Sequence, residues 1–141
     1  MRLLTLLAAV SMTACATAQA QTVTDTEWQL LAVDGTFYEA NATLQIADDG
    51  SLTGSGPCNR WSARNATTLP DLKIEGLRAT RMACDRLADE QVFFDVLIGM
   101  TGVKLAGPKN LVLQGPGDRS MKFSLISVMG LPDCTTCAAK D

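Results

Sequence analysis

The cysteines are the residues of this chain whose type and spacing could carry chemistry. Cys134 and Cys137 form a C-x-x-C pair, which can exchange disulfides or bind soft metal ions, and Met129 could add a thioether ligand for copper(I). A redox C-x-x-C pair normally lies at a helix start beside a strand, whereas this pair follows Pro132 in a polar segment. A terminal disulfide is therefore the favoured interpretation, and copper or thiol-redox chemistry is the alternative.

Few other groups are suited to catalysis. The chain contains no histidine, which removes Ser-His and Cys-His nucleophile pairs and the commonest general base and metal ligand. Carboxylates alone could support a two-acid hydrolase, but Asp48 and Asp49 belong to a predicted turn. Asp89 and Glu90 lie in the early turns of a predicted helix, where the helix dipole favours acids. We therefore expect no enzymatic activity, no cofactor and no metal site.

Asn59 and Trp61 are the remaining candidates for a binding site. They follow Cys58 in the glycine-rich stretch "GSGPCNRWSA" at 54–63. A short polar side chain beside a disulfide most often hydrogen-bonds the local backbone, so for Asn59 we favour a loop-holding role over ligand contact. Trp61 is expected to pack in the core or against a loop, and to be partly exposed because its segment shows little regular pattern.

Residues 1–20 have the features of a bacterial export signal. Arg2 supplies a positive charge, residues 3–10 are apolar, and small residues follow. The apolar stretch is too short to span a bilayer by itself. We therefore expect the mature protein to be exported.

Two cleavage routes are open for this signal. "MTAC" at 12–15 resembles a lipobox, in which Cys15 is lipidated and becomes the mature N-terminus, whereas "AQA" at 18–20 fits an ordinary signal peptidase. We favour the lipobox because the apolar stretch runs directly into the cysteine. Ala16, in place of an aspartate after Cys15, then indicates an outer-membrane lipoprotein facing the periplasm. The alternative is a soluble periplasmic protein.

Export also decides how the other cysteines are interpreted, because an oxidising compartment favours disulfides. Without Cys15 four cysteines remain, and four allow three pairings. Local pairing of Cys134 with Cys137 leaves Cys58 with Cys84. A disulfide closing that loop would stabilise the domain by about 3 to 4 kcal/mol.

Length and composition indicate one globular domain, and the charge bears on its partners. With 141 residues, 47% of them hydrophobic, the chain can bury one real core. The net charge is −3, and the twelve basic residues are scattered along the chain. We therefore expect no nucleic-acid partner, because phosphate binding needs clustered Lys and Arg side chains.

Alternating apolar residues predict a mainly β domain. The stretches with this pattern are 27–35, 42–56 as a hairpin turning at 48–50, 72–77, and 103–126 as three short strands. Trp28 and Leu30 share one face of the first stretch, and Met121 and Phe123 share one face of the last.

Only "DRLADEQVFFDVLIGM" at 85–100 favours a helix, with Asp85 as N-cap and Gly99 at its end. Its expected sheet-facing residues are Leu87, Phe94, Leu97 and Ile98. The predicted fold class is α+β, mainly β: a curved or barrel-like antiparallel sheet with one helix packed across it. This domain covers residues 25–128, and a polar tail at 129–141 carries the C-x-x-C pair.

Five short stretches carry a family resemblance. They are W-x-L at 28–30, G-x-L at 50–52, "CNRW" at 58–61, "TRMAC" at 80–84 and E-x-x-F at 90–93. Together they resemble the META domain, also called the HslJ-like domain, over about residues 25–127. The resemblance implies a small, mainly β envelope domain that is often lipid-anchored, associated with stress responses and without an established enzymatic reaction.

We therefore expect a non-enzymatic envelope or periplasmic protein that acts through stress-related binding or envelope maintenance. Its expected contact with the membrane is the N-terminal lipid anchor, and its protein or small-molecule partner is unknown. Two alternatives remain: a periplasmic copper or thiol-redox protein that uses the C-terminal C-x-x-C pair, and an inhibitor of a secreted protease, a role open to small exported β-proteins.

Overall fold

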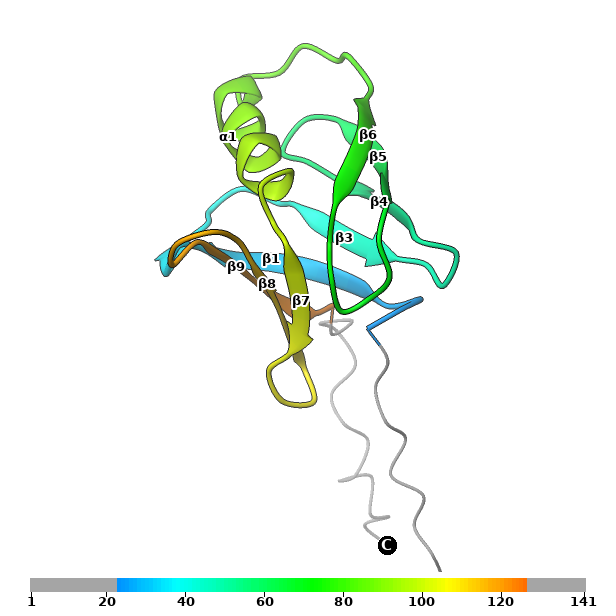
Figure 1. Ribbon diagram of the computed structural model, residues 1–141. Coiled ribbons are helices and arrows are strands. Elements are labelled where there is room, and N and C mark those ends of the chain that lie inside the picture. Colours follow the sequence, from blue (N-terminus) through cyan, green and yellow to red (C-terminus); the bar gives the residue numbers. More distant parts are fainter. Residues whose placement is uncertain (1–22, 127–141) are drawn as a thin grey trace, which may run out of the picture.

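The computed structural model describes residues 23–126, which form one antiparallel β-sheet and one helix (Figure 1). The strands and the helix, in chain order, are β1 (Glu27–Val33), β2 (Thr36–Phe37), β3 (Thr43–Ile46), β4 (Ser51–Ser55), β5 (Arg60–Asn65), β6 (Ile74–Ala79), α1 (Leu87–Leu97), β7 (Gly102–Leu105), β8 (Asn110–Gln114) and β9 (Ser120–Leu125). Among these residues no helix has the length and apolar character needed to cross a membrane.

The nine strands lie in one curled sheet that does not close. Its order is β6-β5-β4-β3-β1-β9-β8-β7, and the short β2 pairs with β1. The two edge strands, β6 and β7, do not pair with each other, and an isolated bridge joins Asp71, in the segment before β6, to Gly102 at the start of β7. At the other end of β6, helix α1 lies beside the opening (Figure 1). The predicted fold class is confirmed as a mainly β fold with a curved, unclosed sheet and a single helix.

The concave face of the sheet and the helix enclose the core. Alternate residues point inward along β1, β3, β4, β5, β8 and β9, as the period of two requires. Trp28 and Leu30 are buried on β1, as predicted, and so are Met121 and Phe123 on β9. The β3–β4 hairpin and the three C-terminal strands also lie where the sequence pattern predicted them.

Trp61 corrects one expectation. It lies in the regular strand β5 and is only 3% exposed, with its ring centroid 6.1 Å from that of Phe93 in an edge-on contact. The prediction of an irregular, partly exposed segment was wrong, because β5 does alternate. Its inward positions are Trp61, the small Ala63 and the buried polar Asn65, and this mixture hides the apolar periodicity.

Helix α1 corrects a second expectation. Its N-cap position is Arg86 and no side chain caps it, so Asp85 is not the N-cap. The buried residues are Glu90, Phe93, Val96 and Leu97, whereas Leu87 and Ile98 are 46% and 51% exposed. Of the predicted sheet-facing residues, Leu97 is buried and Phe94 is partly buried against the core, as expected. The helix is rotated about its axis relative to the prediction, so that Glu90 and Phe93 face inward in place of Leu87 and Ile98.

Candidate functional site

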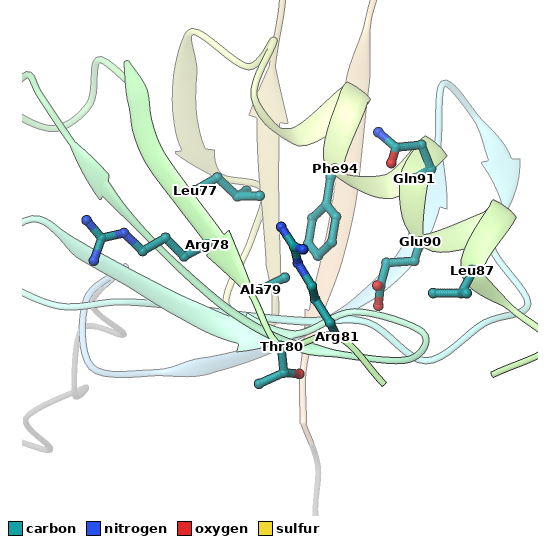
Figure 2. Close-up of a pocket in the computed structure, with 9 residues that line it drawn as sticks. All are labelled: Leu77, Arg78, Ala79, Thr80, Arg81, Leu87, Glu90, Gln91 and Phe94. Carbon is teal, nitrogen blue, oxygen red and sulfur yellow. The ribbon is translucent and has the colours of Figure 1, made fainter. Parts of the chain in front are cut away.

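A hollow of about 710 Å³ lies between the edge strand β6 and helix α1 (Figure 2). Its lining residues are Leu77, Arg78, Ala79, Thr80, Arg81, Leu87, Glu90, Gln91 and Phe94. Leu77 and Phe94 point toward each other across it, and the guanidinium of Arg81 lies between the strand and the helix. The lining is thus mixed: four residues are apolar and five are polar or charged.

Glu90 is the only carboxylate in this lining, and it is 5% exposed. Its Oε2 accepts hydrogen bonds from the backbone N–H groups of Cys58 and Asn59, at 2.9 and 2.6 Å. Its Oε1 accepts one from Nδ2 of Asn59, at 2.6 Å. Three donors therefore compensate the buried charge, and the first turn of α1 is attached to the loop that follows β4.

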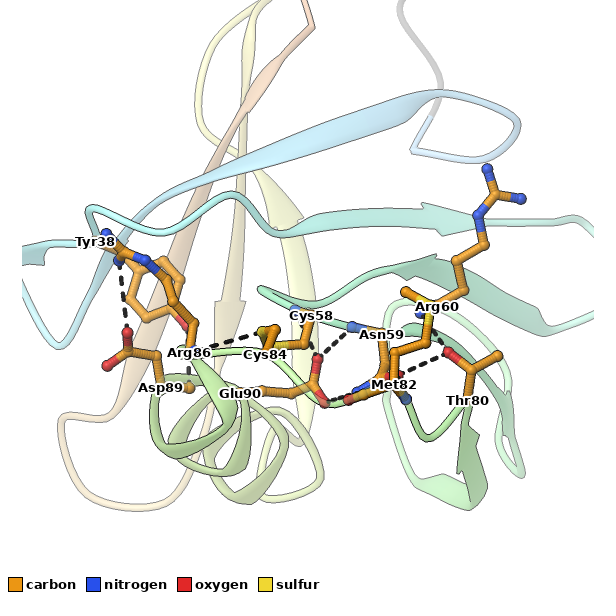
Figure 3. The surroundings of a disulfide bond; sticks show 10 residues. All are labelled: Tyr38, Cys58, Asn59, Arg60, Thr80, Met82, Cys84, Arg86, Asp89 and Glu90. Atoms are coloured by element: carbon orange, nitrogen blue, oxygen red, sulfur yellow. Dashed lines mark hydrogen bonds and ion pairs between the residues drawn. A yellow bond between two sulfur atoms is a disulfide. The ribbon is translucent and has the colours of Figure 1, made fainter.

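Asn59 connects this loop to the segment that follows β6 (Figure 3). The side chain is 3% exposed, and its Oδ1 accepts from the Thr80 hydroxyl at 2.9 Å and from the Met82 N–H at 2.7 Å. Its Nδ2 donates to Glu90 and also reaches the Met82 carbonyl oxygen at 3.5 Å. These contacts are those of a side chain that holds loops together, and they occupy the polar atoms of Asn59.

A disulfide closes the same junction. Cys58 and Cys84 are bonded, with Cα atoms 6.0 Å apart and 26 residues of separation. The bond joins the loop after β4 to the segment just before α1 (Figure 3). This is the pairing that the cysteine count favoured.

Gly56 shows why the stretch before Cys58 is rich in glycine. A Cβ atom at this position would lie 2.8 Å from Oε2 of Glu90, closer than side-chain carbons approach other atoms. The N–H of Gly56 donates to the Asn59 carbonyl oxygen at 2.7 Å, which forms the turn. A side chain at this position would therefore push the Glu90 carboxylate away from the loop N–H groups that donate to it.

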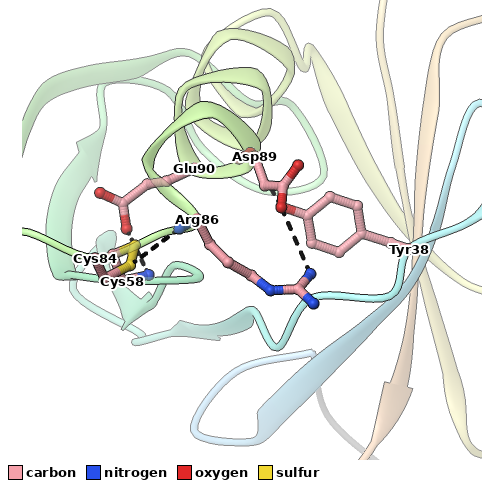
Figure 4. A network of polar contacts seen from close by, with 6 residues as sticks. All are labelled: Tyr38, Cys58, Cys84, Arg86, Asp89 and Glu90. Carbon is pink, nitrogen blue, oxygen red and sulfur yellow. Dashed lines mark hydrogen bonds and ion pairs between the residues drawn. A yellow bond between two sulfur atoms is a disulfide. The ribbon is translucent and has the colours of Figure 1, made fainter.

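Tyr38 lies near the first turn of α1, beside Asp89 and Arg86 (Figure 4). Its hydroxyl donates to the Asp89 carbonyl oxygen at 3.1 Å, and the Asp89 carboxylate lies 3.5 Å from Arg86. Partial burial, reinforced by the negative charges of Asp89 and Glu90, raises the pKa of Tyr38 to about 12.

We expect the single tyrosine to ionise about two pH units later than free tyrosine in an alkaline absorbance titration. Because the folded-state pKa is raised, the stability that neutral Tyr38 contributes is complete below pH 10 and is lost as the pH rises through about 12. Asp89→Asn should lower the pKa of Tyr38, since it removes a neighbouring negative charge. An unshifted titration in the folded protein would contradict this environment.

The structure brings together Cys58, Cys84 and Asn59, and it places Trp61, two residues after Asn59, in the core. The sequence analysis missed the role of Glu90 as the acceptor that holds this junction, because it explained Glu90 only as an acid favoured by the helix dipole. The E-x-x-F stretch at 90–93 contained the only signal for it.

Other predicted residues lie outside the described part of the chain. These are the lipidation site Cys15, the pair Cys134 and Cys137, and Met129. Among residues 23–126 no cluster of three His, Cys, Asp or Glu side chains could hold a metal ion.

Comparison with known proteins gives the family. An NMR structure of a protein from Burkholderia xenovorans is 25% identical, with a TM-score of 0.59 over 89% of this chain and 98% of its own. A second NMR structure is 21% identical, with a TM-score of 0.56 over 74% of this chain and 92% of its own. No curated protein matches significantly. The sequence profile of the META domain matches residues 21–127, which include all the strands, the helix and the Cys58–Cys84 junction, and so the chain belongs to the META domain family.

Proposed function

We propose that this protein is a non-enzymatic binding protein of the bacterial cell envelope, which holds a partner in the hollow between β6 and α1 under stress or during envelope maintenance. The observation that carries the proposal is the state of Glu90. A general acid or base must exchange a proton with the substrate, but both oxygens of this carboxylate accept hydrogen bonds from Cys58 and Asn59. The hollow is therefore better suited to hold a partner against fixed polar groups than to exchange protons with a substrate.

The walls of the hollow also support binding. Leu87, which lines the hollow, is 46% exposed, and Met82, which lines an adjoining hollow together with Leu87, is 61% exposed. These two side chains offer apolar surface to a partner. The disulfide and the Asn59 contacts hold both walls in place before a partner arrives. Such preorganisation reduces the entropy lost on binding.

The envelope location rests on the leader, and it predicts that Cys15 is acylated. Mass spectrometry of the purified mature protein should find diacylglycerol on an N-terminal cysteine, and Cys15→Ser should move the protein from the membrane fraction to the periplasm. A mature protein that begins at Gln21 without lipid would contradict this prediction and leave a soluble periplasmic protein.

The function can be tested with a strain that lacks the protein. We expect the strain to be more sensitive than its parent to at least one of heat, detergent, reducing agent or cell-wall antibiotics. The wild-type gene should restore resistance, but Leu87→Asp, which places a charge at the apolar rim, should not.

Val92→Asp is the matched control, because Val92 is 56% exposed on the same helix and does not line the hollow. It should restore resistance fully. Equal sensitivity of the deletion strain and its parent under all these stresses would refute the proposal, and full rescue by Leu87→Asp would exclude this hollow as the site.

A further inference from the structure

The segment from Arg78 to Met82 is an extended edge that has partners on one side. The Thr80 N–H donates to the Arg60 carbonyl oxygen at 3.0 Å, and Arg78 is in register with Ser62 on β5. Beyond the end of β6, the side-chain amide of Asn59 takes the place of the neighbouring strand. It accepts from the Met82 N–H and donates to the Met82 carbonyl oxygen.

Ala79 and Arg81 therefore turn their backbone groups the other way. Successive residues of an extended strand present their N–H and C=O groups to opposite sides, so these two face away from β5 and Asn59. Among the described residues β6 pairs only with β5, and the backbone of Arg81 makes no hydrogen bond. Residues 77–81 all line the hollow, so this unpaired edge opens into it.

The side chains around the unpaired edge determine which kind of ligand could bind there. Leu77, Leu87 and Phe94 give an apolar wall, in which Phe94 is half-buried. The guanidinium of Arg81 projects into the space between strand and helix, whereas that of Arg78 points away from α1 (Figure 2). Arg81 forms no ion pair with any of residues 23–126, and the facing Glu90 is already engaged. The open side of the hollow thus presents a free cation on a protein of net charge −3.

We propose that the edge from Arg78 to Met82 binds an extended segment of another exported protein by β-strand addition. The segment would pair with the backbone of Ala79 and Arg81, place an aliphatic side chain against the apolar wall, and offer a carboxylate to the Arg81 guanidinium. In strand addition the main-chain bonds provide affinity and the side-chain contacts provide specificity. A lipid chain could fill the apolar part, but it would leave the backbone groups of the edge unpaired. This inference rests on the proposed binding function and names its partner class.

The first test selects partners from a random peptide library displayed on phage, with the full mature protein as bait. Selected peptides should combine β-branched or aliphatic residues with Asp or Glu. For a synthetic selected peptide, Arg81→Gln should weaken binding about tenfold, the loss expected for one charge-assisted contact. Arg64→Gln is the matched control and should leave the affinity within about twofold, since Arg64 is exposed on β5 and does not line this hollow.

Ala79→Pro tests the backbone contact. Proline removes the outward N–H and is tolerated on an edge strand when its nitrogen faces away from the paired neighbour. We expect this variant to keep the melting temperature within a few degrees and to lose at least about tenfold in affinity for the peptide. Unchanged affinity in Ala79→Pro, or a failure to select any peptide, would overturn the inference.

Amide hydrogen exchange gives a second measurement that needs no variant. In the free protein the amides of Ala79 and Arg81 should exchange faster than those of Thr80 and Met82, which are hydrogen-bonded. Bound peptide should slow the first pair selectively. Protection of Ala79 and Arg81 in the free protein would show that the edge is already covered.

The deletion strain separates this inference from the proposed function. If the strain is sensitive to stress and Ala79→Pro rescues it fully, the binding function stands and the strand edge is not the site. If the strain shows no sensitivity although peptide binding follows the pattern above, the proposed function fails and the edge remains a peptide-binding surface.

Discussion

Replacing Glu90 by alanine should lower the free energy of unfolding by about 3 to 5 kcal/mol. The change leaves three donors without their acceptor: the buried backbone N–H and side-chain amide of Asn59, and the partly buried backbone N–H of Cys58. Each buried donor that loses its partner costs about 1 to 3 kcal/mol, and relaxation of the loop recovers part of the sum. Urea unfolding followed by tryptophan fluorescence measures the loss.

Asp89→Ala is the matched control, because Asp89 precedes Glu90 in the same helical turn and its carboxylate makes an exposed ion pair with Arg86, at 3.5 Å. The Asp89 carbonyl oxygen, which accepts from Tyr38, remains in the variant. Its expected cost is at most about 1 kcal/mol. Glu90→Gln should fall between the two variants, since an amide keeps one acceptor oxygen and turns its NH₂ group toward another donor. A Glu90→Ala protein as stable as Asp89→Ala would show that the carboxylate does not hold the junction.

Replacing Cys58 and Cys84 together by alanine should lower the free energy of unfolding by about 3 to 4 kcal/mol. The disulfide restricts the unfolded chain across 26 residues, so its removal stabilises the unfolded state more than it disturbs the folded one. The circular dichroism spectrum should therefore stay that of the wild type. For a domain of this size such a loss is a large part of the total, which is about 5 to 15 kcal/mol.

Chemical reduction provides the control for this variant. It should lower the stability of the wild type by a similar amount and should have little effect on the double variant. Peptide mapping under non-reducing conditions tests the pairing directly. A free Cys58 thiol in protein purified from the periplasm would refute the disulfide and make Cys58 a candidate reactive residue.

The sequence by itself determined the class of fold and most of the strands. Successive residues of a strand point alternately to a solvent-exposed face and to a buried face. This local property produces the period-two alternation of stretches such as Trp28–Leu30 and Met121–Phe123. Turn residues between these stretches separate the hairpins, which pair neighbours in the chain. Cysteine number and spacing favoured the Cys58–Cys84 pairing for a similar reason, because the count left few alternatives.

Only the tertiary structure decided the order of the sheet and the nature of the site. Strand β1 pairs with both β3 and β9, and nothing near β1 in the sequence specifies a partner from the far end of the chain. The orientation of α1 depends on Glu90, whose hydrogen-bond partners lie 31 and 32 residues earlier. The local sequence alone predicts that an acid in the first turn of a helix is exposed to solvent and that Leu87 is buried in the core. In the structure, three hydrogen-bond donors hold the Glu90 carboxylate in a buried position. The local sequence does not reveal this, because a buried carboxylate is stable only where distant parts of the chain bring its partners together.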